Sequence, residues 1–320
     1  MKALQGVEGH VEWVEAERPT CDAGQVRIRV AAAGLNRADL LQRAGLYPPP
    51  PGASPYLGLE CAGVIEEVGP GADWRVGDRV CALLAGGGMA EEVVVDARHV
   101  LPVPEGLSLH EAAAIPEVYA TAWLNLFQLG GLKVGEKVLV HAGASGVGSA
   151  AIQLCKAFGN PVWVSVGSPE RLSYCQGLGA EGGVVRNQNL DDLDGLGPFD
   201  VILDPVGASY AQLNLTLLAR DGRWVIIGLM GGRKVELDLA LVLGKRLQVT
   251  GSTLRNRDDG FKAELLQELG QQVWPLFSEG RLKPQLVDTY PVAFAEAAYA
   301  ELETNQVSGK LVLVIDDTLV

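Results

Sequence analysis

A glycine-rich turn between an apolar run and a helical pattern carries the strongest chemical signal in this sequence. Residues 138–151 read VLVHAGASGVGSAA. Small residues in such a turn let a dinucleotide approach the backbone, while the amide groups and positive dipole of the following helix bind its pyrophosphate. Ser145 stands where the G-x-G-x-x-G pattern has its middle glycine, and Gly146 and Val147 follow it. The order of strand, turn and helix predicts a dinucleotide site at these three residues.

Residues about twenty positions further on select between NADH and NADPH. An NAD site ends this second strand in Asp or Glu, and that carboxylate would repel the extra phosphate of NADPH. Here Gly167 leaves room, Ser168 can donate a hydrogen bond, and Arg171 can form a charge-assisted one. Arg186 is a second cationic candidate, so the sequence predicts NADPH. Two alternatives stay open: Ser168 as the cap of a helix that begins with Pro169, and the arginines as solvated surface charges.

Two further glycine-containing segments follow later strands. They are Asp204–Gly207 and Ile227–Gly232. Because ligands bind at the carboxyl ends of strands in open parallel sheets, we expect Gly207 and Gly228 to lie beside the nicotinamide.

The elements around these motifs change character along the chain. The N-terminal third alternates in short glycine-punctuated segments, which predicts antiparallel strands. We expect them at Gln25–Ala33, Glu60–Val68, Arg79–Leu84 and Ala90–Val95. Between them the proline-rich run Tyr47–Gly52 must be a loop, because proline fixes φ and lacks a backbone donor.

From about Ser108, where Ser108 and Glu111 form a capping box, apolar strands alternate with helical patterns. This alternation predicts a parallel sheet covered on both faces. The expected strands are Lys137–Ala142, Pro161–Gly167, Phe199–Leu203, Trp224–Gly228 and Leu247–Thr250, and the expected helices are Val147–Phe158, Pro169–Leu178 and Tyr210–Leu218. A helix over Phe261–Phe277 and a strand over Lys310–Ile315 complete the chain.

The composition excludes several classes of protein. The chain has 320 residues, 48% of them hydrophobic, which is enough for two packed domains. Its formal net charge of -13 is spread along the sequence, which argues against nucleic acid and anionic membranes as partners. We find no signal peptide or membrane-spanning run and expect a cytoplasmic protein. The five cysteines and four histidines are dispersed without metal-ligand spacing, so no metal site is predicted.

Several segments resemble the quinone oxidoreductase branch of the medium-chain dehydrogenases/reductases. They are Asn36–Pro48, Gly58–Val64, Ala113–Trp123, the glycine-rich fingerprint and the closing Val307–Lys310, so the similarity spans essentially the whole chain. The proline-rich loop and the Ser-Gly-Val-Gly fingerprint are most similar to the group of zeta-crystallin and the tumour-suppressor-inducible quinone oxidoreductase.

This resemblance implies an α/β protein with two domains. A GroES-like β-rich catalytic domain would comprise residues 1–117 and 258–320, and a Rossmann domain with a doubly wound parallel sheet would comprise residues 118–257. It also implies NADPH as donor and a homodimer. The zinc-dependent relatives place a cysteine where this chain has Asn36 and a histidine where it has Leu59, so zinc-assisted alcohol oxidation is not expected.

The resemblance also assigns residues to the site. Asn36, Asp39, Tyr47 and Leu59 fall where the family lines its substrate cleft, and Thr121 falls where the family meets the nicotinamide. We count Asn36, Asp39, Tyr47 and Thr121 as candidate catalytic residues. Thr121 and Lys310 join the candidate cofactor-binding residues. For Asp39 an ion pair with Arg43 is an equal alternative.

The expected reaction is transfer of a hydride or of single electrons from NADPH to a quinone, with hydrogen-bond donors at the acceptor oxygen. A small quinone or conjugated carbonyl would be the partner. Two alternatives remain: reduction of an enal or enone double bond, and a non-catalytic NADPH-binding role.

Overall fold

The computed structural model describes residues 1–186, 193 and 195–319. Its contacts divide the chain into two compact units, residues 1–120 with 254–320 (unit 1) and residues 121–253 (unit 2). The boundaries predicted above were 117/118 and 257/258. None of the helices in the described ranges has the length and apolar character needed to cross a membrane.

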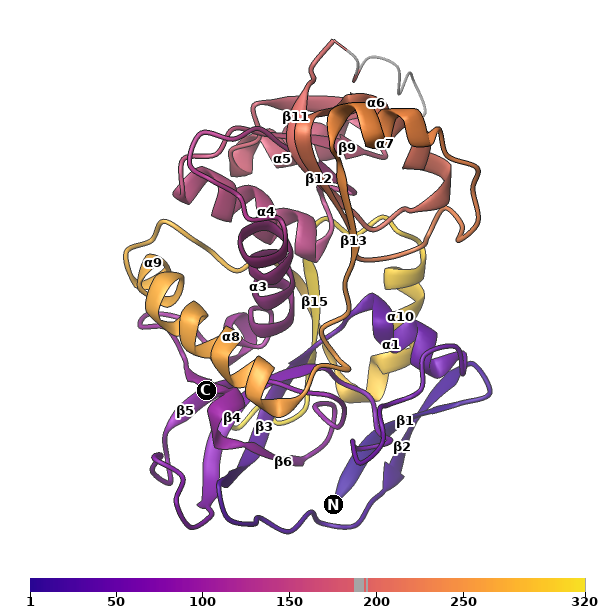
Figure 1. Cartoon of the computed structure of the whole chain (residues 1–320). Helices are drawn as coiled ribbons and strands as arrows, with labels where there is room; N and C mark the ends of the chain where they lie inside the picture. Colours follow the sequence, from indigo (N-terminus) through magenta and orange to yellow (C-terminus); the bar gives the residue numbers. More distant parts are fainter. Residues whose placement is uncertain (187–192, 194, 320) are drawn as a thin grey trace. The chain divides into compact units, whose positions relative to one another are not determined.

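The strands of unit 1 that the alternating patterns predicted pair antiparallel, and β14 and β15 near the C-terminus pair in parallel (Figure 1). Its sheet has the order β14-β15-β3-β4-β5-β7, with β6 paired to β3, and a separate hairpin joins β1 to β2. The strands are β1 (Lys2–Val7), β2 (His10–Glu15), β3 (Gln25–Gly34), β4 (Glu60–Val68), β5 (Arg79–Leu83), β6 (Glu92–Asp96), β7 (Val100–Pro102), β14 (Leu286–Pro291) and β15 (Lys310–Val314).

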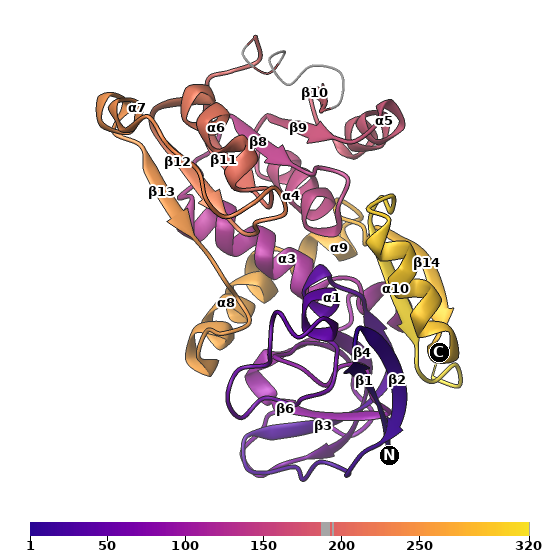
Figure 2. The same cartoon turned by 90° about the vertical axis from the view of Figure 1, so that its right-hand side faces the viewer.

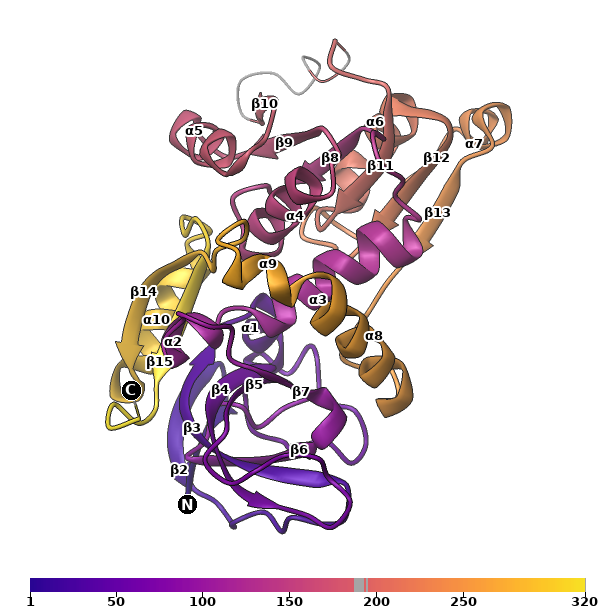
Figure 3. The same cartoon turned by 90° about the vertical axis from the view of Figure 1, so that its left-hand side faces the viewer.

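The helices of unit 1 are short and pack around this sheet. They are α1 (Arg37–Arg43), η1 (Ala97–His99), α2 (Leu109–Ala112), α8 (Asp259–Gln272), α9 (Trp274–Ser278), η5 (Val292–Phe294) and α10 (Ala295–Glu303). Figure 3 shows α10 beside β14 and β15, with which it is in contact. The C-terminal segment therefore completes the N-terminal domain, because β15 pairs with β3.

Unit 2 contains a six-stranded sheet in the order β10-β9-β8-β11-β12-β13, and every pair in it is parallel. Its strands are β8 (Val138–His141), β9 (Val162–Val166), β10 (Gly182–Val185), β11 (Phe199–Asp204), β12 (Leu218–Ile226) and β13 (Gln248–Gly251). Its helical segments are η2 (Leu124–Leu129), α4 (Gly146–Ala157), α5 (Pro169–Leu178), η4 (Ala208–Tyr210), α6 (Ala211–Leu217) and α7 (Leu239–Lys245), and α3 (Pro116–Trp123) leads into the unit.

The sheet of unit 2 is doubly wound. Figure 2 shows β10 and β13 at its opposite ends. Helix α4 packs with α5 and α6 packs with α7, and right-handed crossovers place these two pairs on opposite faces. The chain turns from one half of the sheet to the other between the neighbours β8 and β11. A ligand crevice is expected at this reversal, at the carboxyl ends of the strands.

Three segments differ from the sequence-based prediction. The helix expected over Phe261–Phe277 ends at Gln272 and a second one begins at Trp274, because Pro275 cannot donate to the preceding turn. The change of pattern expected from about Ser108 comes before the unit boundary, because α2 still belongs to unit 1, which extends to Ala120. Strand β12 begins at Leu218, where the prediction had ended a helix.

Candidate active site

The fingerprint turn forms the start of α4, as predicted. Ser145 caps this helix, and its Oγ accepts a hydrogen bond of 3.1 Å from the amide of Gly148. The first amide groups of an α-helix, here from Gly146 and Val147, have no acceptor within the helix. They can therefore donate to an anionic group such as a pyrophosphate.

Close packing at this turn explains its small residues. A Cβ added at Gly143 would lie 2.6 Å from Cβ of Val164, and one added at Gly148 would lie 2.5 Å from the carbonyl oxygen of Gly143. Ala142 adopts a left-handed conformation with φ of 53°, which is unfavourable for an L-residue with a side chain. The turn is thus compressed against β9 and holds one strained alanine.

Arg171 and Arg186 converge at the end of β9. A Cβ added at Gly167 would lie 3.1 Å from Nη1 of Arg171 and 4.0 Å from Nε of Arg186. Burial lowers the pKa of Arg171, and the positive charge of Arg186 lowers it further. Two guanidinium groups so close together repel each other, and a phosphate between them would relieve that repulsion.

Ser168 caps α5, so the capping alternative for this residue is confirmed. Its Oγ accepts a hydrogen bond from the amide of Arg171, and Pro169 occupies the first turn. The exposed Glu170 stands beside it, and a hydrogen bond from Ser168 is the largest cause of the lowered pKa of its carboxyl. A phosphate contact from Ser168 would have to coexist with this bond.

The two later glycine loops pack against each other. The amide of Ala208 donates to the carbonyl of Gly232 at 3.0 Å. A Cβ at Gly228 would lie 2.8 Å from the carbonyl oxygen of Pro205, and Gly207 has φ of 82°. The structure thus brings the loops that carry Gly207 and Gly228 together beyond the carboxyl ends of β11 and β12.

A buried polar network lies beneath this edge of the sheet. Asp204 is fully buried and accepts hydrogen bonds from Nδ2 of Asn214 (3.0 Å) and Nε1 of Trp224 (2.9 Å). Its other oxygen accepts from the amides of Val206 and Gly207. Asp204 therefore fixes the loop that follows β11.

His141 extends this network to β8 and β9. Its Nε2 lies 2.8 Å from Oδ1 of Asn214 and its Nδ1 lies 2.7 Å from Oγ of Ser165. Because Nδ2 of Asn214 donates to Asp204, Oδ1 must accept, and His141 carries its proton on Nε2. Burial lowers the pKa of His141, so the ring is a neutral link between adjacent strands.

Thr121 lies in α3 at the start of unit 2. It is half-buried, and its carbonyl accepts a hydrogen bond of 2.7 Å from Nδ2 of Asn125. Thr121 belongs to unit 2, which also contains the fingerprint turn. A contact with the nicotinamide stays a prediction.

In unit 1, Asn36 and Lys310 meet at a buried carboxylate that the sequence analysis did not identify. Nζ of Lys310 lies 2.7 Å from Oε1 of Glu60 and donates to Oδ1 of Asn36 at 2.6 Å. Nδ2 of Asn36 donates to the same Glu60 oxygen at 2.9 Å, and the amide of Glu117 donates to the other. Both ends of the Asn36 amide are thus engaged by charged groups that are almost fully buried.

Asp39 is fully buried and serves the backbone. Its carboxylate accepts from the amides of Asn36 (2.8 Å) and Gly58 (3.3 Å), and burial raises its pKa to about 6. The ion pair with Arg43 that we weighed for it is wrong, because Arg43 binds two glutamates of α10. These are Glu296 and Glu303. A catalytic part for Asp39 stays a prediction.

Tyr47 begins the proline-rich loop, which contains neither helix nor strand, as predicted. The residue is half-buried, and burial raises the pKa of its phenol. Leu59 is almost fully buried directly before β4. Their contact with an acceptor is not tested by the structure and stays a prediction.

The donor set does not fit a zinc ion. Among the described residues, no group of three or more His, Cys, Asp or Glu side chains is arranged to hold a metal. Glu60, next to Leu59, already has its charge compensated by the ammonium group of Lys310. The amide of Asn36 is bound to both of these charged groups. A zinc ion would have to displace that ammonium from a dry site.

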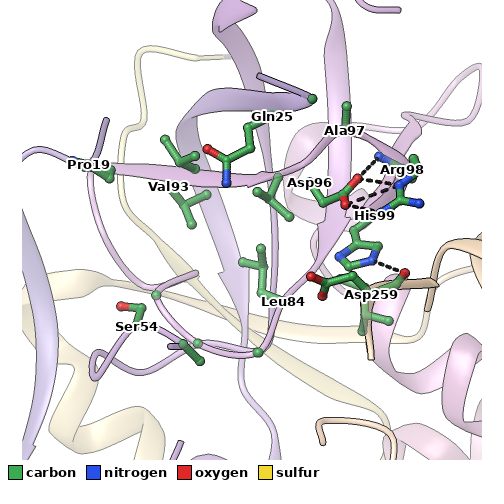
Figure 4. A pocket seen from close by; sticks show the side chains of 18 of the residues that line it. Pro19, Gln25, Ser54, Leu84, Val93, Asp96, Ala97, Arg98, His99 and Asp259 are labelled. Carbon is green, nitrogen blue, oxygen red and sulfur yellow. Dashed lines mark hydrogen bonds and ion pairs between the residues drawn. The ribbon is translucent and has the colours of Figure 1, made fainter. Parts of the chain in front are cut away.

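A cavity of about 770 Å³ lies within unit 1, away from the predicted residues. Figure 4 shows Ser54, Leu84, Val93, His99 and Asp259 around it. His99 is held by a contact of 2.9 Å between its Nε2 and the carbonyl of Asp259. None of the residues predicted for the site lines this cavity.

The residues that the sequence analysis missed are those whose role depends on distant partners. Glu60, Asp204, His141 and Asn214 carry no spacing signal, since each acquires its partner only on folding. A carboxylate at the first position of an apolar strand was the one available hint for Glu60.

Two protein families match the chain. The alcohol dehydrogenase GroES-like domain matches residues 22–105, and the zinc-binding dehydrogenase family matches residues 146–270. With the parallel sheet of unit 2, they confirm the predicted fold class, a GroES-like domain with a Rossmann domain.

Curated relatives cover nearly the whole chain. The synaptic vesicle membrane protein VAT-1 homolog of Homo sapiens is 33% identical over 93% of this chain and 81% of its own length. The Danio rerio protein of that name is 33% identical over 95% of this chain and 66% of its length. The polyketide synthase GfsB of Streptomyces halstedii is 34% identical over 97% of this chain, which spans only 5% of that protein.

Solved structures show the same fold. The quinone oxidoreductase of Pseudomonas syringae has a TM-score of 0.86 at 29% identity and covers 98% of this chain and 99% of its own. The Escherichia coli quinone oxidoreductase complexed with NADPH has a TM-score of 0.87 at 26% identity, with coverage of 98% and 99%. The CurK enoyl reductase has a TM-score of 0.84 at 29% identity and covers 98% of each chain.

Proposed function

The chain belongs to the medium-chain dehydrogenase/reductase superfamily, and from this premise we propose that it is a zinc-independent NADPH:quinone oxidoreductase. The observation that carries the proposal is the convergence of Arg171 and Arg186 on Gly167, where an NAD site would have a carboxylate. We assign the chain to the zeta-crystallin-like group on its proline-rich loop and Ser-Gly-Val-Gly fingerprint.

The cofactor fits the residues of unit 2. The amides at the start of α4 would bind the pyrophosphate, and the two arginines would bind the 2′-phosphate. Asp204 would hold the loop of Gly207 in place beside the nicotinamide. When bound, NADPH supplies the hydride, and the protein supplies binding, orientation and exclusion of water.

Acceptor chemistry favours a quinone over a conjugated double bond. A quinone that accepts a hydride leaves as a phenolate, which can take its proton from solvent. Hydride addition to a conjugated double bond leaves an enolate that must be protonated on carbon, a slower step that a positioned acid in the pocket would assist. The carboxyls of Asp39 and Glu60 are fully buried and hydrogen-bonded, which leaves the phenol of Tyr47 as the donor we assign to the acceptor oxygen.

Enoyl reduction is the second candidate, and the likeness to the CurK enoyl reductase favours it. A third role, NADPH binding without turnover, would require the same arginine pair but no reactive acceptor. We therefore compare ortho-quinones, para-quinones and alkenals at fixed NADPH, and repeat the assay with NADH and after chelator treatment.

Fast quinone reduction that prefers NADPH and ignores the chelator is the expected result. Faster turnover of alkenals would replace the quinone assignment with enoyl reduction. NADPH binding without any turnover would contradict an enzymatic role, and loss of activity to the chelator would contradict zinc independence.

We also propose that the protein is a homodimer. Unit 2 presents exposed apolar side chains on its edge strand β13, on α7 and in the segment between β12 and α7, and an edge strand with a free side favours association. These side chains are Leu229, Met230, Val235, Leu239, Leu243 and Val249. Light scattering after size-exclusion chromatography would show a dimer at micromolar concentration, and a monomer of 33.9 kDa would contradict this.

A further inference from the structure

Arg255 is a buried cation that the proposed mechanism does not use. Only 5% of its surface is exposed, although it lies two residues after the boundary at which the chain returns to unit 1. Its Nε donates to the carbonyl of Ala85 at 2.8 Å, its Nη1 to the carbonyl of Tyr47 at 3.2 Å, and its Nη2 to Oε1 of Gln42 at 2.6 Å. All these contacts lie within unit 1.

These contacts fix the proline-rich loop at both ends. Arg255 binds the first residue of the loop through the Tyr47 carbonyl. It also orients Gln42, whose Nε2 donates to the carbonyl of Pro55 at 2.9 Å, near the end of the loop. Because a run of prolines donates no backbone hydrogen bonds, such side-chain contacts are needed to give the loop a defined position.

The guanidinium also lies against the aromatic ring of Tyr47. The Cζ atom of Arg255 is 5.2 Å from the centre of that ring, a distance typical of a cation–π contact. Since an arginine presents its donors in a rigid plane, it can stack on the ring and bind the carbonyl of the same residue.

We propose that Arg255 is a positioning residue for the acceptor step: it holds the Tyr47 loop in place and sets the orientation of the phenol. This rests on the proposed function, in which Tyr47 donates to the acceptor oxygen. Arg255 itself touches neither acceptor nor cofactor in this scheme.

The positive charge of Arg255 also favours proton donation by the phenol of Tyr47. Burial raises the pKa of Tyr47 and the carboxylate of Glu117 raises it further, whereas the positive charge of Arg255 lowers it. Asp39 and Tyr47 in turn favour the charged form of Arg255 against its burial. Without Arg255, the phenol would face Glu117 alone and become a weaker donor.

A pair of matched substitutions tests this in the full-length protein. Arg255→Met removes the charge and the three donors but keeps the length of the side chain. Arg257→Met is the control. Arg257 lies two residues after Arg255 and also stacks on an aromatic ring, with its Cζ atom 4.6 Å from the centre of the Phe261 ring. With a naphthoquinone as probe, we expect Arg255→Met to lower kcat/KM for the acceptor by about 10- to 100-fold, the loss expected for a few charge-assisted hydrogen bonds.

A comparison of acceptor kinetics with NADPH affinity separates a positioning role from a loss of the whole fold. NADPH affinity, measured by fluorescence titration, should stay within about twofold of the wild type, and added guanidinium salt should restore part of the acceptor kcat/KM. An Arg255→Met protein with unchanged acceptor kinetics would overturn the proposal. An equal loss of NADPH affinity would also overturn it, since Arg255 would then act on the whole fold.

A second measurement needs no activity. Incorporated 3-fluorotyrosine titrates at lower pH than tyrosine, and its ¹⁹F signal at position 47 can be assigned with Tyr47→Phe. Arg255→Met should raise the pKa at position 47, because the positive charge of Arg255 lowers it in the wild type, and Arg257→Met should leave it unchanged. If the wild type reduces no quinone, the proposed function fails, but this titration still decides the part of Arg255; an unshifted pKa at position 47 would contradict it.

Discussion

Replacing Lys310 by methionine would leave the carboxylate of Glu60 buried without its counterion. The two side chains are 4% and 0% exposed, and their charged atoms lie 2.7 Å apart. In this variant Glu60 keeps only neutral donors, Nδ2 of Asn36 and the amide of Glu117. Removal of one partner from a buried ion pair costs about 3 to 5 kcal/mol, a large part of the total stability of a domain.

A double-mutant cycle isolates the pair. Glu60→Gln alone leaves the ammonium of Lys310 buried with carbonyl acceptors only, so its cost should be similar. The double variant Lys310→Met/Glu60→Gln carries no buried charge and should lose much less than the two single losses together, which corresponds to a coupling energy of at least about 3 kcal/mol.

The assay is urea unfolding followed by both circular dichroism and tryptophan fluorescence. Coincident transitions are required, because two compact units can unfold separately. Lys2→Met is the control: its ion pair with Glu15 is 4.0 Å long and largely exposed, so its loss should change stability by less than about 0.5 kcal/mol. A cost below about 1 kcal/mol for Lys310→Met, or strictly additive single and double losses, would refute the reasoning.

Three further outcomes are expected. Burial raises the pKa of Asp39 from 3.8 to about 6, so the protonated form of Asp39 stabilises the fold. This stabilisation is complete below about pH 4 and is lost as the pH rises through about 6, and the total loss is about 3 kcal/mol. Between pH 4 and pH 7, the free energy of unfolding of Asp39→Asn, measured with urea, should therefore fall less than that of the wild type. An equal fall in the two proteins would show that the pKa of Asp39 is not raised. Ala142→Gly should raise the free energy of unfolding by about 1 kcal/mol by relieving the left-handed alanine, while the control Ala144→Gly in the same turn should lower it; a destabilised Ala142→Gly would rule out strain at that residue. Asn214→Leu should cost about 2 to 5 kcal/mol, because it removes the one side chain that bonds both Asp204 and His141 and so leaves one hydrogen bond of each buried group unmade. A free energy of unfolding equal to that of the wild type would argue against the network.

Local features could be predicted from the sequence because their causes are local. Ser108 and Glu111 form the expected capping box, with the Ser108 amide 2.9 Å from the Glu111 carboxylate. The fingerprint turn and the parallel strands follow from glycine positions and apolar runs that a short window contains. These features were sufficient to predict the fold class and to place the glycine-rich turns at the carboxyl ends of parallel strands.

Contacts between distant segments could not be predicted in this way. Lys310 meets Asn36 across 274 positions, and Arg255 meets Gln42 across 213. A local ion pair of Asp39 with Arg43 was an equal alternative from the sequence, but in the folded chain the arginine pairs with two glutamates of α10. Such competition among possible partners is decided by tertiary packing, which periodicity does not report.

The selectivity for the cofactor tests the central claim most directly. We would measure the ratio of kcat/KM for NADPH to that for NADH, with a naphthoquinone acceptor, in the wild type and in Arg171→Ser/Arg186→Ser, with the exposed Arg220→Ser as control. Each charge-assisted contact with the 2′-phosphate should contribute about 1.5 to 3 kcal/mol, so the ratio should fall by about 100-fold or more in the double variant, with little change for NADH. A wild type that prefers NADH, or a ratio that the double substitution leaves unchanged, would contradict the account.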